Sequence, residues 1–159
     1  SDLGFGEEWT TSKYIMSEYF DLSYDERLEP EEQKIYEGNY LVYAIACDWI
    51  RNITFVRHPS QGEDIPIRYV KNCDLNTSII QLKRYSDQFL KDIFKLSGDP
   101  YRDNQPLKVG REVPHSVYKG DCFSEKLRYD FIVLSTSPNY TPVSAEELIP
   151  IIKEYMIVE

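Results

Sequence analysis

The chain has few side chains of the kind that bind metals or act as nucleophiles. Two histidines, His58 and His115, and three cysteines, Cys47, Cys73 and Cys122, are spread over 159 residues without metal-ligand spacing. We therefore expect no metal and no cofactor. Nothing in the sequence marks a thiol as activated, and there is no glycine-rich phosphate-binding loop, so a Cys-His nucleophile and a nucleotide site are both disfavoured.

The segment that ends at Arg57 offers two alternative chemistries. Thr54-Phe-Val-Arg57, followed by Pro59-Ser60, resembles the FLVR strand of SH2 domains. This resemblance implies a phosphopeptide-binding module in which the Arg57 guanidinium grips the phosphate with paired hydrogen bonds. The second alternative is a phosphatase- or hydrolase-like enzyme whose site is built from loop residues near Arg57, His58 and Asp64.

Two further stretches are similar to phosphatase motifs. Val56-Arg-His58 resembles the start of the histidine-phosphatase motif. The run from Asp130 to Pro138 resembles a late strand of metal-dependent serine/threonine phosphatases, in which an Asp-Gly pair then binds metal. Ser137-Pro138 stands in the place of that pair, so the resemblance implies an inactive relative.

The acidic residues are concentrated in the first 37 positions, where eleven acids against three bases give −8 of the net charge of −9. This balance disfavours nucleic acid, which needs clustered lysine and arginine. It favours either a solvated face or docking to a protein with a basic surface. The binding residues that we predict in this head are acids and the aromatic anchors among them: Trp9, Tyr14, Tyr19, Glu26 and Glu29.

A helix over residues 78–96 is the strongest structural prediction, because apolar residues recur there at steps of three and four. We expect this face to pack on a strand that contains Phe131 and Val133. The apolar face consists of Ile79, Leu82, Phe89, Ile93 and Leu96. Lys83 and Asp87, four residues apart, predict a solvated opposite face. Gly98 is predicted to end the helix in the left-handed conformation, and Pro100 to stop it from resuming.

The remaining pattern predicts strands and two terminal helices. The strands are expected at 40–47, 53–57, 65–70, 113–118 and 129–135, and the helices at 7–20 and from Ser144 onward, with a kink at Pro150. The fold class is therefore α+β, with one mixed or antiparallel sheet of four to five strands packed by two or three helices. Residues 1–37 form an acidic helical head of the same single domain, and residues 38–159 form its body.

These observations predict a non-catalytic protein–protein interaction domain, an adaptor or scaffold, cut from a larger protein. The odd, scattered cysteines favour an intracellular location with all three thiols free. Three glycosylation sequons, at Asn52, Asn76 and Asn139, leave a secreted glycoprotein as the alternative. No apolar run is long enough to span a membrane, so we expect a soluble protein. The oligomeric state is left open.

Overall fold

A computed structural model describes residues 22–27, 35, 39–57, 65–120, 128–133 and 147–154. The chain divides into two compact units, residues 3–123 and residues 124–159. The helix expected at residues 7–20 lies outside the described residues. The single domain with an acidic head stays a prediction.

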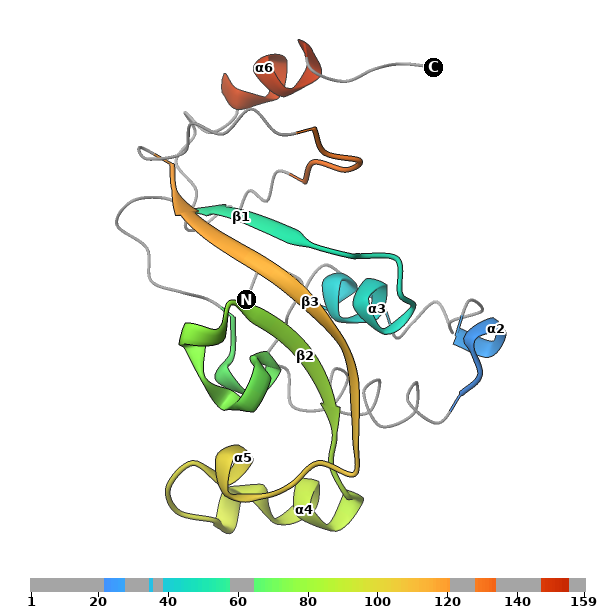
Figure 1. Cartoon of the computed structure of the whole chain (residues 1–159), viewed down its shortest axis with the longest axis vertical. Coiled ribbons are helices and arrows are strands. Elements are labelled where there is room, and N and C mark those ends of the chain that lie inside the picture. Colours follow the sequence, from blue (N-terminus) through green and yellow to red (C-terminus); the bar gives the residue numbers. More distant parts are fainter. Residues whose placement is uncertain are drawn as a thin grey trace. The chain divides into compact units, whose positions relative to one another are not determined.

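One mixed sheet organises the first unit (Figure 1). Its strands are β1 (Ile53–Arg57), β2 (Ile79–Arg84) and β3 (Lys108–Lys119), in the order β1-β3-β2. The protein is thus α+β with a single sheet, and the described residues supply three strands, not four to five. The expected strands at 53–57 and 113–118 are confirmed, the latter as part of the longer β3.

The central strand β3 pairs with its two neighbours in succession along its length. Its residues 108–114 face β2 in antiparallel register, and residues 115–119 face β1 in parallel register. Pro114 lies where one pairing ends and the other begins, with Ile79 as its partner. A proline lacks the N–H of a ladder bond, so this changeover is a position where a central strand can hold one.

The apolar run at residues 40–47, predicted as a strand, is the helix α3 (Tyr40–Ala46). Val42, Tyr43, Ile45 and Ala46 are all buried, so both helical and extended backbones could place apolar residues inward. Periodicity cannot separate these two states in a run that is apolar on every side. The strand prediction was wrong because it rested on the β propensity of these residues, and tertiary packing overrides that propensity.

The predicted helix over residues 78–96 is also wrong, because its first third is the strand β2. After β2, Ser86 Oγ accepts from the Phe89 N–H at 3.1 Å and starts the short helix α4 (Asp87–Asp92), which continues as the 3-10 helix η5 (Ile93–Lys95). Gly98 is left-handed as predicted, with φ +81°. Pro100 does not block a helix but opens one, α5 (Pro100–Asp103), where its missing N–H costs nothing.

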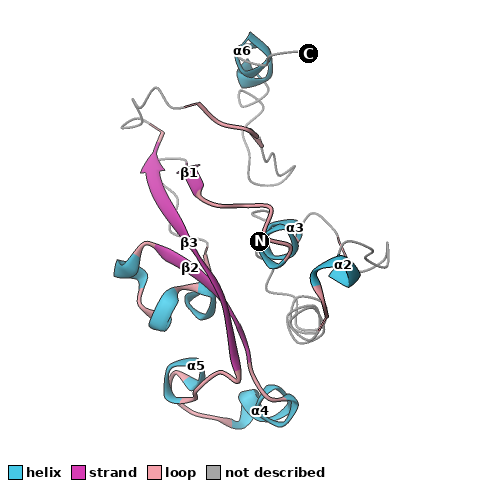
Figure 2. Cartoon of the chain, turned by 45° about the vertical axis from the view of Figure 1, so that its right-hand side comes forward, coloured by secondary structure: helices cyan, strands magenta, loops and turns pink. Residues whose placement is uncertain are grey.

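Residues 65–70, predicted as a strand, contain instead the first of three successive 3-10 helices. These are η2 (Ile67–Tyr69), η3 (Lys71–Cys73) and η4 (Leu75–Thr77). Only Val70 keeps a strand-like contact, an isolated antiparallel bridge to Ile80. In Figure 2 the 3-10 helices and α3 lie on opposite sides of β2 and β3.

The core of the first unit forms between α3, the sheet and the 3-10 segment. Ile80 and Leu82 of β2 and Val113 of β3 are 0–1% exposed and contribute its centre. The full cluster comprises Val42, Tyr43, Ile45, Ala46, Cys47, Ile65, Tyr69, Val70, Ile80, Leu82 and Val113. Burial of Leu82 is confirmed, although in a strand and not in a helix.

In the second unit the described residues are 128–133 and the helix α6 (Leu148–Glu154). Residues 129–133 form no strand, and Phe131 is 87% and Val133 65% exposed. The strand expected at residues 129–135 is therefore absent from the described part of that range, and the packing of Leu82 on it stays a prediction. Pro150 is the third residue of α6 and so lies in its first turn, where a proline is tolerated. Within the described residues, no helix combines the length and apolar character that crossing a membrane requires.

Candidate functional site

The described part of the acidic head contains one helical turn, α2 (Tyr24–Arg27), which its own side chains cap. The N–H and hydroxyl of Ser23 donate to Glu26 Oε2 at 2.8 and 2.6 Å, and the Glu26 N–H donates back to Ser23 Oγ at 3.5 Å. This reciprocal pairing is a capping box. Hydrogen bonds from the Ser23 side chain and backbone lower the pKa of Glu26, so this exposed carboxylate stays charged.

Arg27 fastens α2 to the end of α3. Its Nη1 donates to the Ala46 carbonyl at 2.8 Å, and its Nε donates to the Leu22 carbonyl at 3.2 Å. The Arg27 carbonyl in turn accepts from the Tyr43 hydroxyl at 2.7 Å and from the Cys47 thiol at 3.5 Å. A cation at the last carbonyls of a helix is favourable because it complements the helix dipole. These contacts therefore anchor the acidic turn to the core.

Two large aromatic side chains remain exposed beside this anchor, Tyr24 at 49% and Trp49 at 55%. The Trp49 ring meets the Tyr43 ring edge-on, with centroids 5.5 Å apart. Tyr43 thus contacts both α2 and Trp49. We call the exposed residues of α2 and of the turn at Asp48 and Trp49 the acid–aromatic surface. They are Tyr24, Asp25, Glu26, Asp48 and Trp49.

The turn that carries Trp49 is also tied to the sheet. Arg111 of β3 donates through Nη2 to the carbonyls of Asp48, at 3.5 Å, and Ile50. Its Nε lies 3.5 Å from Asp48 Oδ1. Both ends of the turn that carries Trp49 are therefore held by Arg111.

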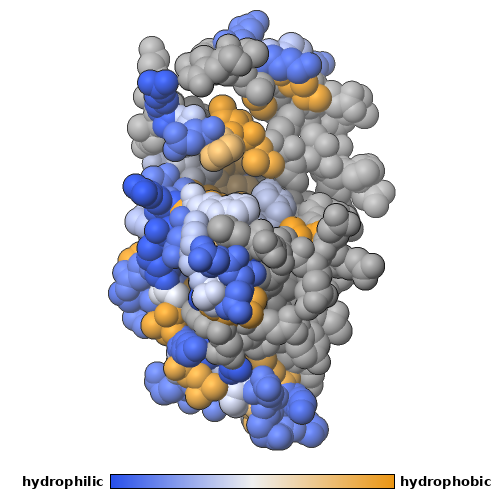
Figure 3. Space-filling model, turned by 90° about the vertical axis from the view of Figure 1, so that its right-hand side faces the viewer, coloured by the Kyte–Doolittle hydropathy of each residue, from blue (hydrophilic) through white to orange (hydrophobic). Residues whose placement is uncertain are grey.

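Figure 3 shows the side of the molecule that faces right in Figure 1, where α2 and α3 are drawn. The described apolar side chains on this side lie in small separate groups among hydrophilic ones.

The structure describes two of the six predicted binding residues. Glu26 lies on the acid–aromatic surface, and Arg57 ends β1, where its carbonyl accepts from the Gly120 N–H at 2.8 Å. The other four lie outside the described residues; they are Trp9, Tyr14, Tyr19 and Glu29. His58 and Asp64 also lie outside them, so the phosphopeptide and enzyme alternatives at Arg57 stay predictions.

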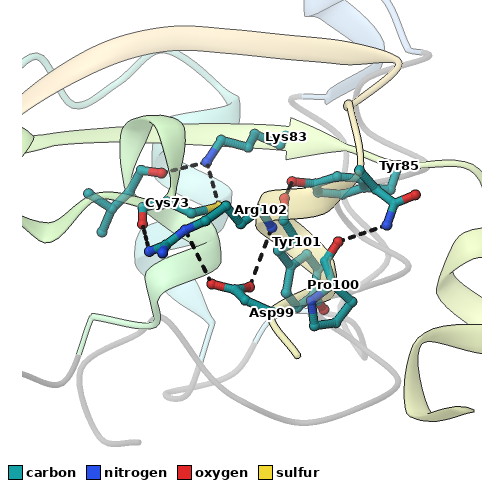
Figure 4. A network of polar contacts seen from close by, with 9 residues as sticks. Cys73, Lys83, Tyr85, Asp99, Pro100, Tyr101 and Arg102 are labelled. Carbon is teal, nitrogen blue, oxygen red and sulfur yellow. Dashed lines mark hydrogen bonds and ion pairs between the residues drawn. The ribbon is translucent and has the colours of Figure 1, made fainter. Parts of the chain in front are cut away.

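A second constellation surrounds a buried lysine of β2. Lys83, predicted on a solvated face, is only 7% exposed. Its Nζ donates to the carbonyls of Val70 and, at 3.3 Å, Arg68, and it lies 3.7 Å from Cys73 Sγ (Figure 4). Burial lowers the pKa of Lys83, because the ammonium loses hydration. Lys83 forms no pair with Asp87, because α4 begins only after β2 has ended.

Aromatic and basic side chains surround this constellation. Arg102 Nη2 donates to the Cys73 carbonyl at 3.0 Å, while Arg102 Nε lies 3.6 Å from Asp99 Oδ2. The Tyr85 hydroxyl donates to the Tyr101 carbonyl at 3.3 Å. Burial raises the pKa of both tyrosines, so both hydroxyls stay neutral at any physiological pH.

Sequence reasoning missed three residues that shape these sites: Arg27, Trp49 and Lys83. The spacing Ser23-x-x-Glu26 is a signal for a helix start and would have found α2. No sequence signal marks Lys83 as buried, because two of its three partners are backbone carbonyls and the third, Cys73, is ten residues away. Among the described residues no three metal-ligating side chains come together.

Comparison with known proteins adds no relative, because no family model, curated protein or solved structure matches this chain.

Proposed function

We propose that this chain is a non-catalytic interaction domain that docks a protein with a basic surface through the acid–aromatic surface. The observation that carries the proposal is the exposure of Trp49 on a turn that Tyr43 and Arg111 hold in place, next to an anchored acidic helix. Tryptophan is among the residues most often found at the energetic centre of interfaces. An exposed tryptophan beside carboxylates therefore supplies both an anchor and a charge.

The charges of the head favour a basic partner. The carboxylates of Asp25, Glu26 and Asp48 are exposed on the described surface, and the head as a whole carries −8. Such a field steers an oppositely charged protein and accelerates its association more than it strengthens the final complex. Removing the Trp49 side chain should thus change mainly the dissociation rate constant, and reversing a charge should change mainly the association rate constant.

Two single substitutions separate these contributions. Trp49→Ala removes the anchor and should weaken binding by about 2 kcal/mol, roughly thirtyfold in Kd, mainly through faster dissociation. Asp25→Lys reverses one charge without touching the capping box. It should slow association and flatten its dependence on salt, since rim charges act chiefly on the rate of encounter.

The test starts from proteins captured by the immobilised full chain from its native source and identified by mass spectrometry. The main captured protein is then purified, and its association and dissociation rates are measured at several salt concentrations. Leu107→Ala, 62% exposed, is the apolar control, and Asp103→Lys on α5 is the matched charge control. If Trp49→Ala and Asp25→Lys bind as the controls do, the acid–aromatic surface is not the docking site.

A further inference from the structure

Lys83 and Cys73 place an amine and a thiol in contact inside the first unit. Lys83 Nζ lies 3.7 Å from Cys73 Sγ, and the two residues are 7% and 2% exposed. They come from different elements, β2 and η3, and Figure 4 shows their side chains pointing toward one another. A contact of this kind can become a covalent bond when the sulfur is oxidised.

Backbone interactions keep the amine at the sulfur. Lys83 Nζ donates to the carbonyls of Arg68 and Val70, and these two hydrogen bonds hold the end of the lysine side chain in place. Burial lowers its pKa, so a larger fraction of the amine is unprotonated than for an exposed lysine. An unprotonated amine has a free electron pair and can act as a nucleophile.

The backbone around the cysteine is equally constrained. Asn72 and Cys73 both have left-handed φ angles, +55° and +51°, which are rare for residues other than glycine. Arg102 Nη2 holds the Cys73 carbonyl at 3.0 Å. Cys73 is a free thiol, and its sulfur is therefore presented to Lys83 by a fixed and sterically costly turn.

We propose that Cys73 and Lys83 form a sulfur–nitrogen cross-link, a sulfenamide, when the protein meets a peroxide. This is a modification site that does not depend on the proposed docking function. Sulfenic acids are known to condense with nitrogen nucleophiles that lie beside them. Here the fixed amine raises the effective concentration of nucleophile at the sulfur above that of any thiol in solution.

The reaction balances with one peroxide. The Cys73 thiol gives up its proton, its sulfur attacks one peroxide oxygen, and the O–O bond breaks; the leaving hydroxide takes up that proton, so the products are a sulfenic acid and one water. Lys83 Nζ then attacks the sulfur, the S–O bond breaks, and the hydroxyl leaves as a second water with a proton from nitrogen. The sulfur loses two electrons, and hydrogen peroxide, as the oxidant, gains them.

The cross-link has a consequence for reversibility. The sulfenamide shields the sulfur from further peroxide, which would otherwise carry it to the irreversible sulfinic and sulfonic acids. A thiol reductant opens the S–N bond and restores both side chains. The link also joins η3 to β2 covalently, so the oxidised protein should resist unfolding more than the reduced one.

The experiment treats the full chain carrying Cys122→Ser with one equivalent of hydrogen peroxide, so that this thiol cannot form a disulfide. Intact mass should fall by two hydrogen atoms, and peptide mapping should join the Cys73 peptide to the Lys83 peptide. Dithiothreitol should reverse both changes. Cys47 is the internal control, because it is as buried as Cys73 but is not in contact with an amine; its peptide should be joined to no lysine peptide.

Lys83→Met removes the amine and keeps an unbranched apolar chain of similar length, and in this variant Cys73 should proceed to sulfinic acid when a second equivalent of peroxide is added. If that variant fails to fold, the peptide map of the chain that keeps Lys83 tests the proposal by itself. An unmodified Cys73, a sulfinic acid in the presence of Lys83, or a cross-link that retains an oxygen atom would overturn the proposal.

Discussion

Leu82 allows a quantitative test of the core, because it is 1% exposed in the middle of β2. Leu82→Ala removes three carbon atoms, each worth about 0.8 kcal/mol in burial, which gives about 2.4 kcal/mol of lost transfer free energy. Its neighbours Ile80 and Val113 are fully buried and belong to fixed strands, so the site cannot close completely. The remaining cavity should raise the loss of unfolding free energy to about 3–4 kcal/mol.

Urea unfolding of the full chain, followed by tryptophan fluorescence, measures this loss. Trp49 contacts Tyr43 of the core and therefore reports on the first unit. Leu107→Ala is the matched control, because the same side chain is 62% exposed there and should change stability by less than about 0.5 kcal/mol. A loss below about 0.5 kcal/mol for Leu82→Ala, or one equal to that of the control, would refute the assignment of β2 to the core.

Three further predictions concern the buried lysine, the thiols and the left-handed glycine. Burial lowers the pKa of Lys83 in the folded chain below its ordinary 10.5, the value expected in the unfolded chain. Between the folded-state pKa and 10.5 the unfolded chain therefore binds a proton that the folded chain does not. The stability of the wild type relative to Lys83→Met, from urea midpoints at several pH values, should therefore rise with pH through that window, and a constant difference contradicts this. Titration with a thiol reagent should find Cys47 and Cys73 slow in the native protein, and all three thiols, Cys122 included, free after denaturation without reductant; a missing thiol would reveal a disulfide. Gly98→Ala should cost about 1 kcal/mol in thermal or urea unfolding, because the φ of +81° is strained for alanine although the nearest atom leaves room; an unchanged stability would show that the loop adapts.

The sequence predicted β1 and part of β3 as strands and failed at β2, where both faces are buried. The β-branched and aromatic residues of β1, such as Thr54 and Phe55, favour an extended backbone. In β2 the polar Gln81 and Lys83 are as buried as their apolar neighbours, because η2 and η3 cover their side. Because buried and exposed residues do not alternate along β2, its apolar residues also fit the spacing of a helix.

The candidate sites were predictable only in part for a related reason. Glu26 could be singled out because charge and local spacing are properties of the sequence itself. Arg27 and Lys83 act through the carbonyls of Ala46 and Val70, which every residue carries and no side-chain pattern reveals. Recognising these contacts required the fold, because they join segments that are distant in the chain.

The changeover along β3 has a consequence for how the protein is made. Both partners of β3 precede it in the chain, and Ile53 finds His115 across about sixty residues. During synthesis β1 and β2 leave the ribosome as unpaired segments, and neither can pair in the sheet until β3 follows them. Folding that waits for such distant contacts is slow and leaves strand edges open to other chains. A nascent chain arrested before Lys108 should therefore depend on chaperones, and one released after Lys119 should not.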